Sequence, residues 1–171
     1  MSLGVIETKR LVLRPLGPRD FDAIWEMAQD EDIVRMMLVW PWPPSEEFTR
    51  QRLTLEDTKT GLVSAVTLKG ETIGMAGLSN GGVWYGLGKR FWGQGYGQET
   101  LAAKIEQGFA DPKMDKLIAG TWHDNPVSMH ILEKAGFERT GWGKAYCDGR
   151  NAVTEGPDYE LTRERWERLR I

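Results

Sequence analysis

The sequence predicts one α/β (α+β) domain, residues 1–171, with a mixed sheet of six or seven strands and about four helices. The length of 171 residues suits one domain and allows a sizeable buried core. In the middle of the chain, three strand-like segments follow one another through short turns, which indicates an antiparallel meander. A glycine-rich loop and a helix then lead to a further strand, and this kind of connection favours a parallel pair.

The predicted strands are short runs rich in branched or aromatic residues and bounded by turn residues. Pro15 ends the first of them, and glycine-containing turns separate the strands of the meander. In chain order they are TKRLVLRP (8–15), LVSAVTL (62–68), TIGMAGL (72–78), VWYGL (83–87), KLIAGTW (116–122), FERTGWG (137–143) and DYELT (158–162).

The predicted helices begin at residues that favour helix starts and show apolar residues at helical spacing. The best delimited one begins at Asn125-Pro126 and ends at Gly136. In chain order the four helices begin at Pro18, Ser45, about Gly97 and Asn125, and RERWERL (163–169) closes the chain with charge around one tryptophan.

Composition and charge disfavour several classes of protein. A net charge of −3, from 22 basic and 25 acidic residues, provides no broad positive field for a nucleic acid. No stretch approaches the roughly 20 apolar residues of a membrane span, and no secretory signal is visible, so we expect a cytoplasmic protein. One cysteine, Cys147, and two histidines seven residues apart provide no metal-binding spacing, so no metal is expected.

The stretch FWGQGYGQET (91–100) has glycines at alternate positions immediately before a helix. It matches neither the P-loop nor the dinucleotide fingerprint, because both need other spacings. Glycines still permit close approach of a ligand, and free N–H groups at a helix start attract anions, with Lys89 and Arg90 nearby. Taken alone, the stretch is also compatible with a plain glycine-rich turn.

A second motif lies one strand downstream. WGQGYGQE (92–99) and NPVSMHILEKAGFERTG (125–141), at this separation, resemble the Gcn5-related N-acetyltransferase superfamily, particularly its branch that modifies the N-termini of ribosomal proteins. The resemblance extends from TKRLVLRPL at the front, through WPWPPS, to LTRERW near the end. It implies a mixed sheet in which two adjacent parallel strands splay apart to admit acetyl-coenzyme A.

The resemblance also implies which residues bind the coenzyme. The backbone from Gly93 to Gly97 would hold the pyrophosphate, the strand before the loop would pair with the pantetheine arm, and Ser128 would lie near the thioester sulfur. The expected coenzyme-binding residues are Tyr85, Gly86, Leu87, Arg90, Trp92, Gly93, Gln94, Gly95, Tyr96, Gly97, Asn125 and Ser128.

Catalysis requires a group that accepts a proton from the amine and a group that serves the leaving thiolate. Many relatives carry an acidic residue where this chain has Gly82 and a tyrosine where it has Leu132. The expected catalytic residues are therefore Ser128 on the thiolate side, Asn125, and His123 as the base, with Asp124, Tyr146 and Asp158 as other candidates for the base. Cys147 is expected to be incidental, and His130 to pack or to face solvent.

The leading hypothesis is an acetyl-coenzyme A dependent enzyme that transfers the acetyl group directly to a protein N-terminus or a small-molecule amine. The expected partners are acetyl-coenzyme A and an amine acceptor, without nucleic acid or membrane, in a monomer or homodimer. Because both familiar acid/base residues are missing, the alternative is a non-catalytic acyl-coenzyme A sensor or interaction module. A plain structural domain would leave the paired motifs unexplained. The sequence does not identify the acceptor, whose site is expected near Trp40, Trp42 and Tyr146.

Overall fold

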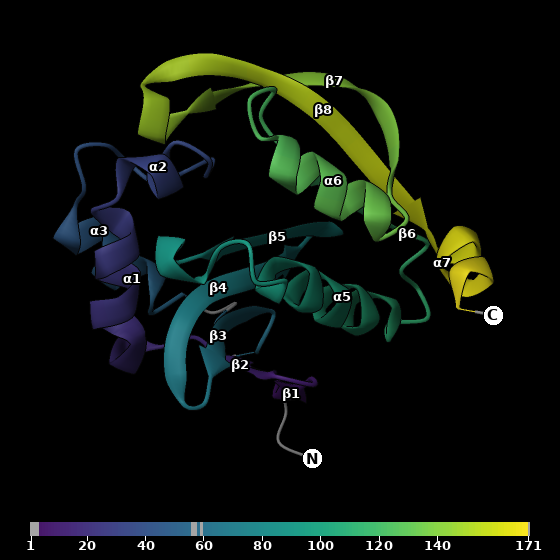
Figure 1. Ribbon diagram of the computed structural model, residues 1–171, viewed down its shortest axis with the longest axis horizontal. Helices are drawn as coiled ribbons and strands as arrows, with labels where there is room; N and C mark the ends of the chain where they lie inside the picture. Colours follow the sequence, from purple (N-terminus) through teal and green to yellow (C-terminus); the bar gives the residue numbers. More distant parts are fainter. Residues whose placement is uncertain (1–3, 56–57, 59, 171) are drawn as a thin grey trace.

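The computed structural model describes residues 4–55, 58 and 60–170, and it is organised around one sheet. Its eight strands have the order β1-β2-β3-β4-β5-β6-β8-β7 (Figure 1). All neighbours are antiparallel except β5 and β6, which are parallel. The strands are β1 (Ile6–Glu7), β2 (Leu11–Pro15), β3 (Val63–Leu68), β4 (Glu71–Ser79), β5 (Gly82–Leu87), β6 (Lys116–Gly120), β7 (Glu138–Cys147) and β8 (Ala152–Thr162).

The mixed sheet and the meander of β3, β4 and β5 are confirmed, but the predicted number of six or seven strands was too low. The additional strand is β1, whose two residues are too few to show an alternating pattern. Its pairing with β2 gives it strand structure, so tertiary contact rather than local sequence creates it.

Six α-helices lie in the described part of the chain, rather than about four. They are α1 (Phe21–Ala28), α2 (Glu31–Val34), α3 (Glu46–Arg52), α5 (Tyr96–Phe109), α6 (Pro126–Lys134) and α7 (Arg163–Leu169). Three short 3-10 helices accompany them, η1 (Pro18–Asp20), η2 (Lys89–Phe91) and η3 (Asp148–Arg150). The α2 helix is a single turn, too short to show a helical period in the sequence.

The predicted helix ends agree with the caps in the structure. The Ser45 side chain accepts a hydrogen bond from the Phe48 amide, and the Asn125 side chain accepts one from the Ser128 amide, each at 3.1 Å. Gly136 has a φ of +99°, the left-handed conformation that commonly ends a helix. These signals are local, which is why the sequence predicts them well.

The helices cover both faces of the sheet (Figure 1). On one face, α1 and α3 pack around Ala65 of β3 and Met75 of β4. On the other face, α5 and α6 bury the apolar side chains of β6 and β8, including Leu117 and Leu161. Along β5 the side chains alternate, so Tyr85 packs with α5 and Trp84 packs on the α1 face.

The sheet is interrupted at the parallel pair. Gly82 of β5 and Ile118 of β6 form the one residue pair between these strands, and the Ile118 amide donates to the Gly81 carbonyl at 2.8 Å. After this pair the strands separate, although β5 continues to Leu87 and β6 to Gly120. We call this divergence the splay, and it matches the arrangement that the family resemblance implied.

Hydrogen bonds near the middle and in the last turn of α5 hold this helix in place. Near its middle, the buried Lys104 ammonium donates to the Leu62 carbonyl at 3.0 Å and to the Ser64 hydroxyl at 2.8 Å. Burial lowers the pKa of Lys104 to about 8, because removal from water disfavours the charged ammonium. In the last turn, Glu106 accepts from Arg170 at 2.8 Å, which ties α5 to the end of α7.

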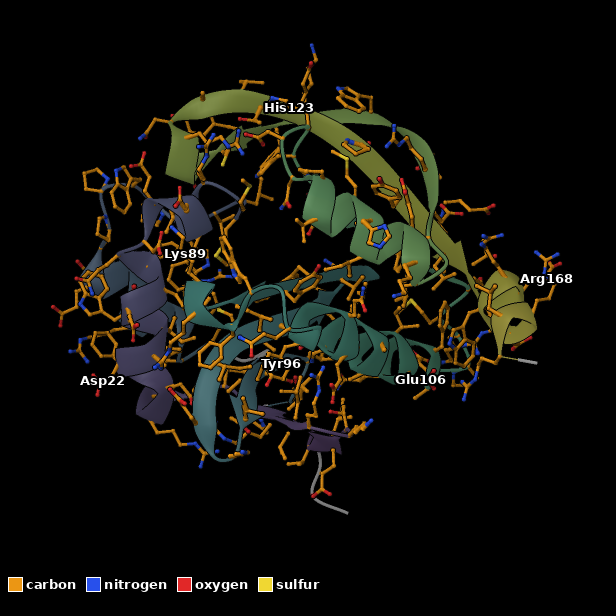
Figure 2. All side chains as sticks on the ribbon, viewed as in Figure 1. Asp22, Lys89, Tyr96, Glu106, His123 and Arg168 are labelled. Carbon is orange, nitrogen blue, oxygen red and sulfur yellow. The ribbon has the colours of Figure 1, made fainter. Side chains whose placement is uncertain are left out.

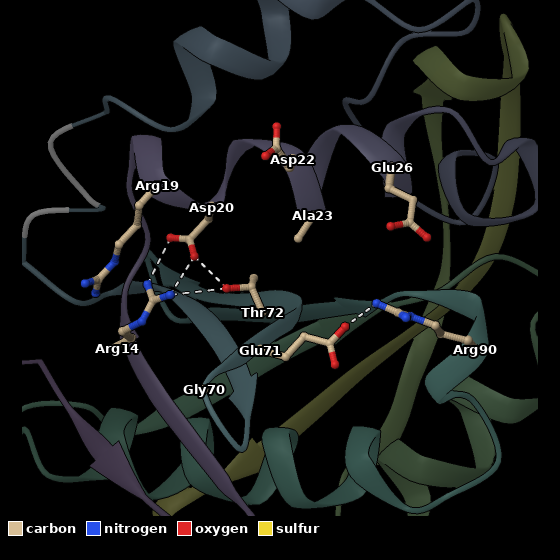
Figure 3. A pocket seen from close by; sticks show the side chains of 10 residues that line it. All are labelled: Arg14, Arg19, Asp20, Asp22, Ala23, Glu26, Gly70, Glu71, Thr72 and Arg90. Carbon is tan, nitrogen blue, oxygen red and sulfur yellow. Dashed lines mark hydrogen bonds and ion pairs between the residues drawn. The ribbon is translucent and has the colours of Figure 1, made fainter.

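A buried ion pair joins β2 to the start of α1. The Arg14 guanidinium donates two hydrogen bonds to the Asp20 carboxylate, at 2.6 and 2.9 Å, and Asp20 also accepts from Thr72 at 2.6 Å (Figure 3). Burial raises the pKa of Asp20, but the hydrogen bonds from Arg14, Thr72 and the Gly17 amide outweigh it, so the pKa lies below its ordinary value.

We expect Asp20→Asn to lower the free energy of unfolding by about 3 kcal/mol, because the largely buried Arg14 then loses its counter-ion. Asp20 stabilises the fold fully above the unfolded-state pKa of about 3.9, and this contribution is lost as the pH falls through the lower folded-state pKa. The variant should therefore lose less stability on acidification than the wild type. Urea unfolding between pH 3 and pH 7 measures both effects.

The matched control is Glu46→Gln, which removes the exposed pair between Glu46 and Arg50. We expect a change of less than about 0.5 kcal/mol, because exposed i,i+4 pairs contribute little. Equal effects of the two substitutions would show that Asp20 is not a structural anchor.

Candidate functional site

The loop before α5 leaves the start of this helix open. Gly93 and Gly95 have φ values of +71° and +81°, a region that favours glycine. Gly95 is the N-cap of α5, and no side chain caps this helix, in contrast to α3 and α6. Because the first amides of a helix have no partner within it, they are available for an anion, and the helix dipole favours one there.

The N-terminal strands hold this loop in place. The Glu99 carboxylate accepts hydrogen bonds from the Thr8 hydroxyl at 2.6 Å and from the Arg10 side chain and amide at 2.7 Å. Arg10 also donates to the Gln94 carbonyl at 2.9 Å and lies over the Tyr96 ring. Burial raises the pKa of Glu99, but the bonds from Thr8 and Arg10 more than offset it, so the pKa is lowered.

Sequence reasoning missed Thr8 and Arg10 as supports of the loop. The segment TKRLVLRP was assigned to a strand and to the family resemblance, but nothing local indicates that its Arg10 reaches Glu99 across 89 residues. Two side chains near the N-terminus of the chain, Thr8 and Arg10, thus support the loop of the coenzyme motif.

The structure brings Tyr85, Gly97 and Ser128 together, from β5, α5 and α6. The Tyr85 and Ser128 hydroxyl oxygens are 3.3 Å apart, and Asn125 caps the helix that carries Ser128. A Cβ atom on Gly97 would lie 3.1 Å from the Tyr85 ring and 3.4 Å from Ile131, so only glycine fits without displacement. Burial raises the pKa of Tyr85, and the Ser128 hydrogen bond offsets this only in part, so the phenol is protonated at neutral pH.

The other predicted coenzyme residues border this group. The Trp92 indole donates to the Leu87 carbonyl at 2.8 Å, which joins the loop to the end of β5, and Gly86 lies between Tyr85 and Leu87. The Gln94 side chain donates to the Arg90 carbonyl at 2.9 Å. These contacts make the loop compact, and they use side chains rather than the first amides of α5.

The predicted charges near the loop are already paired. Arg90 binds Glu71, and Lys89 binds Asp32. Figure 3 shows the Arg90 guanidinium turned toward Glu71 on the α1 side of the sheet. An anion at the start of α5 would thus depend mainly on backbone amides.

The structure places His123 apart from Tyr85 and Ser128. Its ring is exposed, and its Nδ1 atom lies 3.1 Å from the Glu155 carbonyl oxygen. His123 is well separated from Tyr96 at the start of α5 (Figure 2). No contact in the described part of the chain joins His123 to the Tyr85–Ser128 pair, so its expected role as the base has no geometric support.

Asp124 is held by two arginines. Arg150 donates to it at 2.7 and 3.0 Å, and Arg35 donates at 3.1 Å. The hydrogen bond and the positive charge of Arg150 lower the pKa of Asp124 in spite of its burial, which makes Asp124 a poor proton acceptor. The pairing joins the loop after β6 to the segment after α2 and to the β7–β8 turn.

The other residues that the sequence analysis considered for catalysis differ in their surroundings. Tyr146 is exposed on β7, and Asp158 is exposed on β8. Cys147 is fully buried, with its thiol 3.1 Å from the Met37 carbonyl oxygen, which supports a packing role. Gly82 occupies the start of β5 and Leu132 is buried in the core, so neither position supplies an acid or base.

One pocket lies away from the Tyr85–Ser128 pair. It is an open space of about 550 Å³ lined by charged residues of α1, the β3–β4 turn and Arg90 (Figure 3). Neither Tyr85 nor Ser128 lines it. Within the described ranges, no three potential metal ligands cluster, and no helix is long and apolar enough to cross a membrane.

The chain is similar in sequence or in fold to known acetyltransferases. The chain is 24% identical over 156 residues to the uncharacterized N-acetyltransferase p20 of Bacillus licheniformis, which covers 84% of this chain and 88% of that protein. AAC(6')-Ib, solved with ribostamycin and coenzyme A, has a TM-score of 0.75 at 22% identity, covering 95% of this chain and 99% of that one. The ribosomal-protein-S5-alanine acetyltransferase of Vibrio fischeri has a TM-score of 0.75 at 20% identity, covering 95% and 98%.

The two solved structures show that the fold is shared. A family model described as an acetyltransferase (GNAT) domain matches residues 10–138. Since this match extends over most of the chain, the protein belongs to the GNAT acetyltransferase family.

Proposed function

We propose that this protein is an acetyl-coenzyme A dependent N-acetyltransferase that transfers the acetyl group directly to a primary amine. The observation that carries the proposal is the uncapped start of α5, where Gly97 packs beside the Tyr85–Ser128 pair at the splay of β5 and β6. A helix start that can bind an anion thus lies next to two hydroxyl groups that can donate hydrogen bonds to the sulfur of a thioester. The coenzyme A in the structure of AAC(6')-Ib supports the choice of ligand.

The coenzyme fits the chemistry of the residues present. Its pyrophosphate would accept hydrogen bonds from the free amides between Gly93 and Gly97, in the positive end of the α5 dipole. Its pantetheine arm would follow β5 past Gly86, because the β5 edge beyond Gly82 has no strand partner at the splay. The arm would then bring the thioester toward Ser128.

Tyr85 and Ser128 would act on the thiolate side of the reaction. When the amine nitrogen forms its bond to the carbonyl carbon, the carbon–sulfur bond breaks and the sulfur acquires negative charge. A protonated phenol and a hydroxyl 3.3 Å apart can donate hydrogen bonds or a proton to that sulfur. Tyr85, from the strand, would thereby take the place of the helix tyrosine that Leu132 replaces.

The proposed acceptor is a primary amine, and its identity is the next question. The names of two structural relatives point to different acceptors, the alanine N-terminus of a ribosomal protein and ribostamycin. The motifs that resemble the ribosomal-protein branch favour a protein N-terminus for this chain. A panel of peptides, amino acids, polyamines and aminoglycosides distinguishes these acceptors by thiol release.

The second candidate function is a non-catalytic acyl-coenzyme A sensor. It is favoured by Gly82, Leu132 and the outward position of His123, since no familiar base faces Ser128. Binding of acetyl-coenzyme A without thiol release for any amine in the panel would establish this function instead of the enzyme.

We expect Gly97→Asp to abolish coenzyme A binding, with a loss of about 100-fold or more in affinity. The new side chain crowds Tyr85 and adds negative charge where the pyrophosphate should bind. Isothermal titration with coenzyme A measures the effect, and the thermal midpoint of the free protein verifies folding.

Val153→Asp is the matched control, because Val153 is exposed on β8 and receives the same added charge. It should bind coenzyme A like the wild type. Full affinity in a folded Gly97→Asp variant would refute the assignment of this helix start to the pyrophosphate.

We expect Tyr85→Phe and Ser128→Ala each to lower kcat by about 10-fold to 100-fold, because each removes a hydroxyl from the thiolate side. Coenzyme A affinity should change little. The control is Thr54→Ala, which removes an exposed hydroxyl just after α3, from a residue with no assigned role in the site. Unchanged kcat in both Tyr85→Phe and Ser128→Ala would exclude the pair from the transfer step.

A further inference from the structure

Asp158 points to the face of the sheet opposite α5 and α6. Its neighbours along β8, Tyr159 and Leu161, pack in the core with those helices. Because side chains alternate along a strand, Asp158 lies on the face that carries α1 and α3. Tyr85 and Ser128 belong to the α5–α6 side, so Asp158 borders the sheet from the other side of the proposed coenzyme path.

Asp158 is also next to the splay. In the sheet it pairs directly with Gly120 of β6. Gly120 follows Ile118, the residue of β6 that pairs with β5, by two positions. The pairing of β6 with β5 ends at Ile118. Gly120 therefore borders the splay on one side and Asp158 on the other.

Glycines leave room around this carboxylate. A Cβ atom on Gly143 of β7 would lie 2.8 Å from Asp158 Oδ2, and one on Gly120 would lie 3.7 Å from Oδ1. The carboxylate therefore lies over backbone that carries no side chain. Larger residues at these two positions would shield it or displace it.

Among the carboxylates of the described strands β6, β7 and β8, that of Asp158 has no cationic partner. In the described strands β6, β7 and β8 there are three others, and each has a cation partner: Glu138 with Arg165, Glu155 with Lys144 and Glu160 with Lys116. No described residue donates a hydrogen bond or forms an ion pair with Asp158, which is exposed. An approaching ammonium group could therefore pair with Asp158 without displacing another cation.

We propose that Asp158 receives the acceptor amine in its cationic form and accepts its first proton, an inference that rests on the proposed acetyl transfer. The ammonium approaches from the α1 face while the coenzyme occupies the α5–α6 face. One proton passes from nitrogen to the Asp158 carboxylate and then to solvent. The nitrogen lone pair bonds to the carbonyl carbon, the carbon–sulfur bond breaks, and the second nitrogen proton balances the one that the sulfur acquires.

The test compares two small acceptors that differ in charge. Propylamine is cationic at neutral pH, whereas hydroxylamine is uncharged. With acetyl-coenzyme A and after subtraction of the rate without enzyme, Asp158→Asn should lower kcat/KM for propylamine by about tenfold or more. The value for hydroxylamine and the affinity for coenzyme A should stay near those of the wild type.

Glu160→Gln is the matched control, since Glu160 lies two residues along β8 on the same face and is paired with Lys116. It should leave both acceptors unaffected. Equal propylamine kinetics in the wild type and Asp158→Asn would overturn the role of Asp158 while the proposed function stands. Equal losses for both acceptors would overturn the charge-specific role. A wild type that binds acetyl-coenzyme A but releases no thiol with these two amines or with any amine of the acceptor panel would overturn the transferase function itself.

Discussion

The single residue pair between β5 and β6 is the constraint on which the rest of the site depends. Backbone groups of a strand need partners, and an internal strand normally finds them along its whole length. Here the pairing stops after Gly82 and Ile118, so β5 presents free backbone in the middle of the sheet. The strands can diverge because the core beneath α5 and α6 contains residues of both halves of the sheet, Leu78 and Val83 on one side and Leu117 and Leu161 on the other, which keeps the two halves in one fold.

A second connection holds the halves at a distance from this pair. The turn between β7 and β8 packs against the segment after α2, where the Asp148 amide donates to the Leu38 carbonyl at 3.0 Å. Arg150 donates to the Arg35 carbonyl at 2.8 Å and to Asp124. Two sets of contacts thus limit how far the strands separate: the Gly82–Ile118 backbone pair at one end, and the hydrogen bonds of Arg35 and Arg150 at the other. The Asp124 carboxylate accepts hydrogen bonds from both arginines, which leaves it poorly suited to proton transfer.

The distribution of charged side chains differs between the two sides of the splay. Lys89, Arg90 and Arg10 are all neutralised by carboxylates, which leaves backbone amides as the groups for an anion at α5. In the late strands, the carboxylates of Glu138, Glu155 and Glu160 are paired with cations, whereas Asp158 has no partner among the described residues. In the proposed reaction, the anionic coenzyme and the cationic amine would therefore bind on opposite faces of the splay.

The sequence by itself determined the elements whose signals are local. Caps at Ser45 and Asn125, the glycine at 136 and the turns of the meander depend on a few neighbouring residues, and the structure agrees with them. The glycine loop and the Asn125 motif likewise predicted the family. Only the tertiary structure decided which side chains meet, because Arg10 and Glu99, or Tyr85 and Ser128, are far apart in the chain. It also turned His123 outward and left Asp158 unpaired, since strand alternation and register, not residue type, set the face on which a side chain lies.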